Sequence, residues 1–156
     1  MSGSLWKKDQ LKGGTYVLPS KAITIKNINK LFLVLILVQG AHSSEEYMGR
    51  LWENFPPATY LTGVISENPE TGFLIANIGL FVFGIICWFI LVSGSSLFAR
   101  PIIWFWIVLE TINGLGHPIW SLIQGAYTPG VATAFILLLL SILIYRQLKR
   151  LHAAGQ

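Results

Sequence analysis

The 156-residue sequence contains little charge, since 12% of its residues are Asp, Glu, Lys or Arg whereas 53% are hydrophobic. Soluble domains carry about 25% charged residues, so this composition argues against a water-soluble globular domain and against a disordered tail. The formal net charge of +4 comes from 11 basic and 7 acidic residues, an excess too small to indicate a nucleic-acid-binding protein. The composition therefore predicts a membrane protein.

Cysteine is also nearly absent. The single cysteine, Cys87, lies in an apolar run, which excludes an internal disulfide and any metal site built from a cysteine cluster. The chain length allows one domain. A membrane-spanning helix needs about 20 mostly apolar residues, so four spans would occupy roughly half of this chain.

Four apolar segments are present, and they predict an all-α, polytopic membrane protein with a four-transmembrane-helix bundle. We expect the spans at about 31–49, 72–98, 101–124 and 129–146. They form one membrane domain over 31–150, preceded by a basic N-terminal segment over 1–30 and followed by a C-terminal tail over 151–156. The first span is cleanly apolar only in its first eleven residues, so it either ends early or turns its polar last third towards protein.

The connection over residues 50–71 contains Pro56-Pro57 and Asn68-Pro69, and this composition predicts a loop. The positions of the basic residues predict the orientation. All of the lysines and arginines except Arg50 lie in the N-terminal segment, in the connection between the second and third spans, or at the end of the fourth span over residues 146–150. Because cytoplasmic loops are enriched in Lys and Arg, we expect both termini to be cytoplasmic and the protein to lie in the cell inner (plasma) membrane.

Polar residues inside two spans indicate a site. Glu110 lies about 15 Å along the third span, and an ionisable residue at such depth usually faces the bundle interior and indicates a function. Asn113 and His117 continue a polar stripe from Glu110 at helical spacing. Gly114 and Gly116 are expected to allow close helix approach there.

On the first span, His42 and Glu46 share a helix face with Gln39, and Glu45 lies at its edge. At 1.5 Å per residue, His42 lies about 18 Å from the cytoplasmic end and the two glutamates about 22–24 Å. By the same rise, Asn113 and His117 of the third span lie about 20 and 25 Å deep. The two polar patches should therefore meet in the outer half of the membrane.

These residue types suit a metal ion. Imidazole and carboxylate ligands together fit a divalent transition metal, here zinc or iron, and a zinc ion with an open position activates water. The candidate metal ligands are His42, Glu46, Glu110 and His117.

The sequence His42-Ser43-Ser44-Glu45-Glu46 resembles the signature of the HXXEE-motif family of small bacterial integral membrane proteins, whose function is not established. An Asn-x-x-x-His element at Asn113–His117 and a Tyr-x-Pro-Gly-x-x-Thr element at Tyr127–Thr133 are similar to further elements of that family. Together the three elements extend the resemblance over about residues 31–148. The resemblance implies a site formed by His42, Glu45, Glu46, Asn113, His117, Tyr127 and Thr133.

Two function classes follow. The first is a metal-dependent hydrolase or other lipid-modifying enzyme that acts on a lipid or other hydrophobic substrate in the bilayer. Its candidate catalytic residues are Glu45, Glu46, Asn113 and Tyr127, a glutamate acting as general acid or base and Asn113 or Tyr127 polarising the substrate. The second is a non-enzymatic accessory subunit of an oligomer or larger membrane complex, which would hold heme, pigment or quinone.

Two further interpretations are less favoured. The histidines and glutamates could mark a solvated membrane boundary or fasten helices to one another. A proton-coupled transporter would use the stripe from Glu110 to His117, but this stripe has no polar continuation past Trp106 towards the cytoplasm.

Overall fold

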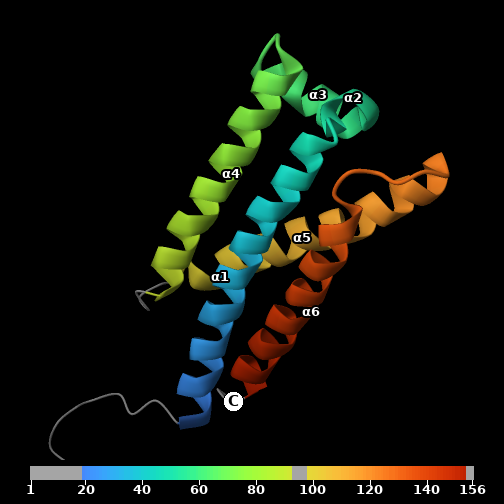
Figure 1. The fold of residues 1–156 in the computed structure, drawn as a ribbon. Coiled ribbons are helices and arrows are strands. Elements are labelled where there is room, and N and C mark those ends of the chain that lie inside the picture. The colour runs from blue at the N-terminus through green and yellow to red at the C-terminus, as the bar shows by residue number, and fades with distance from the viewer. Residues whose placement is uncertain (1–18, 93–97, 154–156) are drawn as a thin grey trace, which may run out of the picture.

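The computed structural model describes residues 19–92 and 98–153, and within these ranges every regular element is a helix (Figure 1). The predicted all-α class is therefore confirmed. The helices, in chain order, are α1 (Pro19–Met48), α2 (Leu51–Asn54), α3 (Pro56–Ile65), α4 (Pro69–Val92), α5 (Ala99–Gln124) and α6 (Val131–Ala153). The predicted basic N-terminal segment lies largely outside the described residues, as does the stretch 93–97 at the end of the second predicted span.

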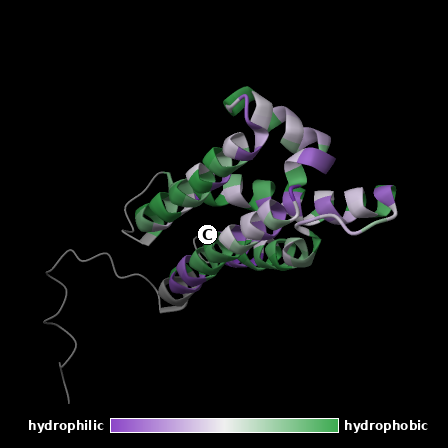
Figure 2. Cartoon of the chain, turned by 45° about the horizontal axis from the view of Figure 1, so that its top comes forward, coloured by the Kyte–Doolittle hydropathy of each residue, from purple (hydrophilic) through white to green (hydrophobic). Residues whose placement is uncertain are grey.

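Three of the described helices, α4, α5 and α6, are long and apolar enough to cross a membrane. Figure 2 shows hydrophobic residues gathered along the long helices, with hydrophilic residues more frequent towards helix ends. The predicted span over 31–49 forms the C-terminal part of α1, which is 30 residues long. This helix is not among the three, and polar residues flank its apolar middle on both sides, from Lys26 to Lys30 and from His42 to Glu46.

The long helices pack around an apolar core. α6 packs against both α1 and α5, and α1 also packs against α4 (Figure 1). Phe32 and Ile36 of α1, Trp106 of α5 and Ile144 of α6 are fully buried in this core. On α4, by contrast, Ile78, Ile86 and other large apolar side chains are exposed, as expected for a helix that faces lipid.

One end of the bundle brings together the start of α1, the end of α4, the start of α5 and the end of α6. The indole nitrogen of Trp88 donates to the carbonyl oxygen of Asn29 at 3.2 Å, and Arg100 lies 2.9 Å from His152. The described ends of the chain, at the start of α1 and the end of α6, both lie here (Figure 1). α2, α3 and the connection between α5 and α6 lie at the other end, where the candidate site is formed.

The predicted loop over residues 50–71 is wrong for most of that segment, because it contains α2 and α3. Pro56 begins α3, since proline is well accommodated in the first turn of a helix, where its missing N–H is not needed. α3 packs closely on α4 at Gly72, where a Cβ atom would lie only 2.3 Å from the carbonyl oxygen of Thr62. The proline pair therefore begins a helix inside the segment predicted to be a loop.

A candidate metal centre formed by two histidines and a glutamate

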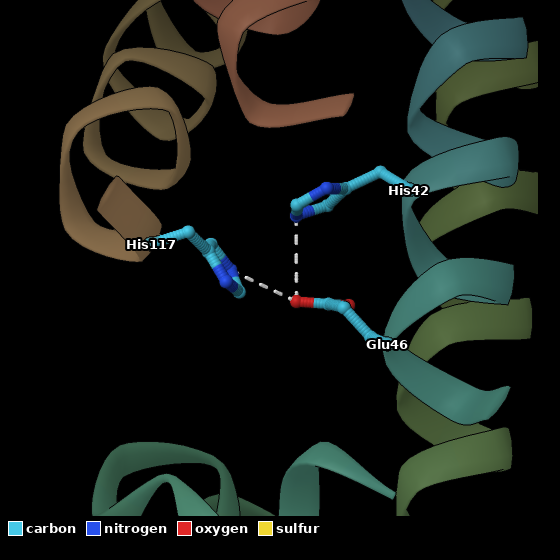
Figure 3. Close-up of side chains that lie close together, drawn as sticks. All are labelled: His42, Glu46 and His117. Atoms are coloured by element: carbon cyan, nitrogen blue, oxygen red, sulfur yellow. Dashed lines mark ion pairs between the residues drawn. The ribbon is translucent and has the colours of Figure 1, made fainter. Parts of the chain in front are cut away.

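Three buried side chains from two helices converge near one end of the bundle. His42 and Glu46, one turn apart on α1, meet His117 of α5 (Figure 3). The same oxygen, Oε1 of Glu46, lies 3.3 Å from Nε2 of His42 and 3.1 Å from Nε2 of His117. The side chains are almost sealed from solvent, with residue exposures of 0% for His42, 8% for Glu46 and 4% for His117. One ligand atom of each residue lies within 4.8 Å of the other two, so the group could hold a metal ion.

Close packing of α5 on α6 brings His117 to this position. A Cβ atom on Gly114 would lie 2.6 Å from Cβ of Leu138, so only glycine permits the observed approach. The predicted role of Gly114 in helix approach is thus confirmed. The same prediction for Gly116 is wrong, because no described residue beyond its own helix lies within 4 Å of a Cβ atom placed there.

The hydrogen bonds around Thr133 define which nitrogen of His42 carries a proton. The Thr133 hydroxyl donates to Oε2 of Glu45 at 2.7 Å, and an ionised carboxylate can only accept. Since a hydroxyl has a single hydrogen, Thr133 must accept from Nδ1 of His42, which lies 2.7 Å away. A neutral His42 therefore carries its proton on Nδ1 and directs the lone pair of Nε2 at Glu46.

A lone pair and a carboxylate oxygen cannot form a hydrogen bond. Among the described residues, the buried Nε2 of His42 has no hydrogen-bond partner, and Nδ1 of His117, the ring nitrogen that does not approach Glu46, has none either. Buried polar atoms normally have partners, and an unpaired one costs about 1–3 kcal/mol. A cation between Nε2 of His42, Nε2 of His117 and Oε1 of Glu46 would give the lone pair of His42 and the carboxylate oxygen a common partner.

Glu45, beside Glu46 in the sequence, points towards a different partner. Its carboxylate accepts hydrogen bonds from the backbone N–H groups of Gly130, Ala132 and Thr133 at 3.0, 3.3 and 3.1 Å. Ala132 and Thr133 lie in the first turn of α6 and Gly130 directly precedes it. The N–H groups of a first turn have no partner within the helix and carry partial positive charge. Glu45 therefore caps α6 from α1, which supports a structural role for this carboxylate.

The connection between α5 and α6 covers the two histidines. Gly130 has φ +95°, a conformation that favours glycine, and a Cβ atom there would lie 2.8 Å from ring atoms of both His117 and His42. The Tyr127 hydroxyl in the same connection donates to Oε1 of Glu45. This hydrogen bond raises the pKa of Tyr127, because the carboxylate stabilises the protonated phenol. Tyr127 and Glu45 together hold the connection over the site.

Glu110 and Asn113 do not join the three-residue group. Glu110 is fully buried, but its neighbours are the amides of Asn113, 3.2 Å away, and Gln39. Phe55 was not predicted as a site residue, yet the centroid of its ring lies 5.8 Å from that of His117, so it packs beside the three-residue group. No sequence signal identified Phe55, since it belongs to the segment predicted to be a loop.

A family model described as a protein of unknown function with HXXEE motif matches residues 31–145, well over half of the chain. The chain belongs to this family. No curated protein and no solved structure matches the chain significantly. In this HXXEE protein the His and the second Glu of the motif, His42 and Glu46, face His117, whereas the first Glu, Glu45, caps α6.

Proposed function

We propose that this HXXEE protein is an integral membrane protein that binds a divalent transition metal ion, zinc or iron, through His42, Glu46 and His117. The observation that carries the proposal is the shared position of Oε1 of Glu46 opposite two imidazole nitrogens. In a tetrahedral zinc site with bonds of about 2.0–2.1 Å, neighbouring ligand atoms lie roughly 3.3 Å apart. The distances of 3.3 and 3.1 Å from that oxygen to the two nitrogens are close to this spacing, and all three ligand atoms lie within 4.8 Å of one another.

The proposal includes α1 as a fourth membrane span, with its polar last third turned towards protein. This is supported by the burial of Gln39, His42 and Glu46 against α5 and α6. The basic residues in the first part of α1, at the start of α5 and at the end of α6 gather at one end of the bundle, which favours that end as cytoplasmic. The metal centre would then lie in the outer half of the inner membrane.

The ligand set also suggests an activity. Two histidines and a glutamate leave one position of a tetrahedral zinc ion free, which is the arrangement of catalytic zinc rather than of structural zinc. Such an ion lowers the pKa of a bound water to about 7 and polarises a carbonyl group. Because the site lies between membrane helices, a lipid or another hydrophobic molecule is the expected substrate, and hydrolysis is the reaction that this chemistry favours.

The four predicted catalytic residues have different roles in this proposal. In this proposal Glu46 is a metal ligand, and Glu45 and Tyr127 hold α6 and its preceding connection in place. Asn113 is engaged with Glu110 and lies beside the group rather than in it. The metal and its water would carry the chemistry.

The alternative of an accessory subunit that holds heme or another flat pigment is less well supported. The imidazole rings of His42 and His117 meet edge to face with centroids 4.8 Å apart, and Gly130 packs against both rings. This arrangement suits a single ion between two nitrogens better than a macrocycle between two rings. A colourless, metal-containing protein would favour the ion.

Metal analysis of the full chain, purified in detergent without chelator, tests the proposal. We expect about one zinc or iron ion per chain, and its loss when His42 and His117 are both replaced by alanine. His152→Ala is the matched control because His152 lies at the opposite end of the bundle, beside Arg100. Equal metal content in the double variant and the wild type would refute the site.

A further inference from the structure

The buried carboxyl group of Glu110 is not used by the proposed metal centre. Its side chain on α5 is 0% exposed, and among the residues that the structure describes no cationic side chain forms an ion pair with it. Its polar neighbours are two neutral amides, those of Gln39 on α1 and Asn113 on α5. Burying an ionised carboxylate without a counter-charge is very costly, so its protonation state can be examined from the hydrogen bonds around it.

A chain of hydrogen bonds that begins on α4 has a defined direction. The backbone carbonyl oxygen of Phe73 can only accept, so the side-chain atom of Asn77 at 3.1 Å must be the amide nitrogen. The oxygen of the Asn77 amide then faces Ser43, whose hydroxyl donates to it at 2.6 Å. The single hydrogen of Ser43 is thereby used, and its oxygen must accept from the next residue.

That next residue is Gln39, whose amide nitrogen donates to the hydroxyl of Ser43 at 3.3 Å. The other terminal atom of Gln39 is then its oxygen, and it lies 3.1 and 2.9 Å from the two carboxyl oxygens of Glu110. Two oxygens at this distance repel each other unless one of them carries a hydrogen. Turning the Gln39 amide round would move the same conflict to Ser43, because two acceptors would then face each other there.

We infer that Glu110 is held as a neutral carboxylic acid that donates its proton to Gln39, at the head of a directed chain of hydrogen bonds through Ser43 and Asn77. The chain joins α5, α1 and α4 and gives each acceptor along it a donor. Ionisation of Glu110 would leave two oxygens facing each other inside the bundle and would add a second negative charge near Glu46. Glu110 is therefore a protonated acid that binds Gln39 rather than a metal ligand.

This bond also positions the metal centre, and that part of the inference rests on the proposed function. Gln39, His42 and Glu46 lie on one face of α1, so a bond from Glu110 to Gln39 sets the rotation of this face towards α5. His117 lies two turns further along α5 on the same side as Glu110. Glu110 is accordingly a positioning residue that acts on the ligands through Gln39.

Infrared spectroscopy of the full chain in lipid nanodiscs at neutral pH tests the protonation directly. We expect a carbonyl stretching band of a protonated carboxylic acid that disappears in Glu110→Gln and persists in the matched variants Glu45→Gln and Glu46→Gln. The band should shift in Gln39→Met, because the acceptor of the acid's hydrogen bond is removed. The absence of any band that depends on Glu110 would overturn the inference, even if the protein binds metal.

Metal affinity tests the positioning role separately. Glu110→Gln keeps a neutral donor towards Gln39 and should hold metal affinity within about twofold, whereas Glu110→Ala should lower it about tenfold, as for other outer-sphere partners. If Glu110→Ala does not fold, Gln39→Met removes the same bond. Unchanged affinity in the variants that lose the bond would overturn the positioning role while leaving the metal centre itself intact.

Discussion

The hydroxyl oxygen of Thr133 on α6 lies 2.7 Å from Nδ1 of His42 on α1, 91 residues away in the sequence. The same oxygen lies 2.7 Å from the carboxylate of Glu45. The hydroxyl therefore accepts a hydrogen bond from His42 and donates one to Glu45. Metal-binding histidines commonly donate their second nitrogen to such a partner, which fixes the ring and its tautomer. The relationship therefore gives His42 the orientation that a metal ligand needs before any ion is bound.

Removing the hydroxyl of Thr133 should weaken metal binding without leaving a cavity in the core. Thr133→Val keeps the shape of the side chain but leaves Nδ1 of His42 without a partner, and we expect metal affinity to fall about 10–100-fold. Thr133→Ser retains the hydroxyl and should bind nearly as tightly as the wild type. Competition with a chelator of known affinity measures both, and wild-type affinity in Thr133→Val would contradict the role assigned to the hydroxyl.

The neighbouring glutamates of the HXXEE motif provide a matched pair of substitutions. Glu45→Gln removes the charged cap of α6 and should lower the free energy of unfolding by about 1–2 kcal/mol while leaving the metal ligands in place. Glu46→Gln removes the anionic ligand and should abolish most metal binding with a smaller loss of stability. Thermal unfolding and metal content, measured on both variants, should separate the two effects, and identical behaviour of the pair would show that the assignment is wrong.

Two glycines in the connection after α5 have positive φ angles but differ in their surroundings. Gly125 has φ +63°, and a methyl group added there would meet open space. Gly125→Ala should therefore lower the free energy of unfolding only through backbone strain, by about 1 kcal/mol. Gly130→Ala adds the same kind of strain and also drives a methyl group into the rings of His42 and His117. We expect metal binding to persist in the first variant and to be lost in the second, as measured by metal content. Equal retention would mean that Gly130 does not cover the site.

The hydrogen bond from Tyr127 to Glu45 predicts a pH dependence. Because this bond raises the pKa of Tyr127 above its ordinary value of about 10, the folded state holds the phenol proton more tightly than the unfolded chain. Its contribution to stability is fully present below pH ~10 and is lost as the pH rises through the raised pKa. The ultraviolet titration difference between wild type and Tyr127→Phe should show a late-titrating phenol, and Glu45→Gln should return it towards the ordinary range. An ordinary titration of Tyr127 in the wild type would contradict the bond.

Helical periodicity was sufficient to predict part of the site. His42 and Glu46 are four residues apart, so any helix places them on one face, and the depth of His117 in its own helix placed it near them. The structure does bring these three side chains together. The overall helical class followed from the apolar segments for the same reason.

The roles of the remaining carboxylates depend on how the helices are rotated against each other, and a single sequence does not contain that information. Neighbouring residues on a helix point about 100° apart, so Glu45 and Glu46 must face different partners, but only packing decides which one faces His117. Glu110 lies on the correct face of α5 yet about two turns before His117, where it meets Gln39 instead of the histidines. Gly130 covers the site through a backbone conformation that side-chain patterns do not reveal.

X-ray absorption spectroscopy at the edge of the bound metal identifies the atoms that coordinate it. We expect two imidazole nitrogens and carboxylate or water oxygen at about 2.0–2.1 Å from the ion, with loss of imidazole scattering in His42→Ala and in His117→Ala. The His152→Ala variant should give the wild-type spectrum. A spectrum without imidazole scattering, or one that neither His42→Ala nor His117→Ala changes, would show that the ion is not bound by His42, Glu46 and His117.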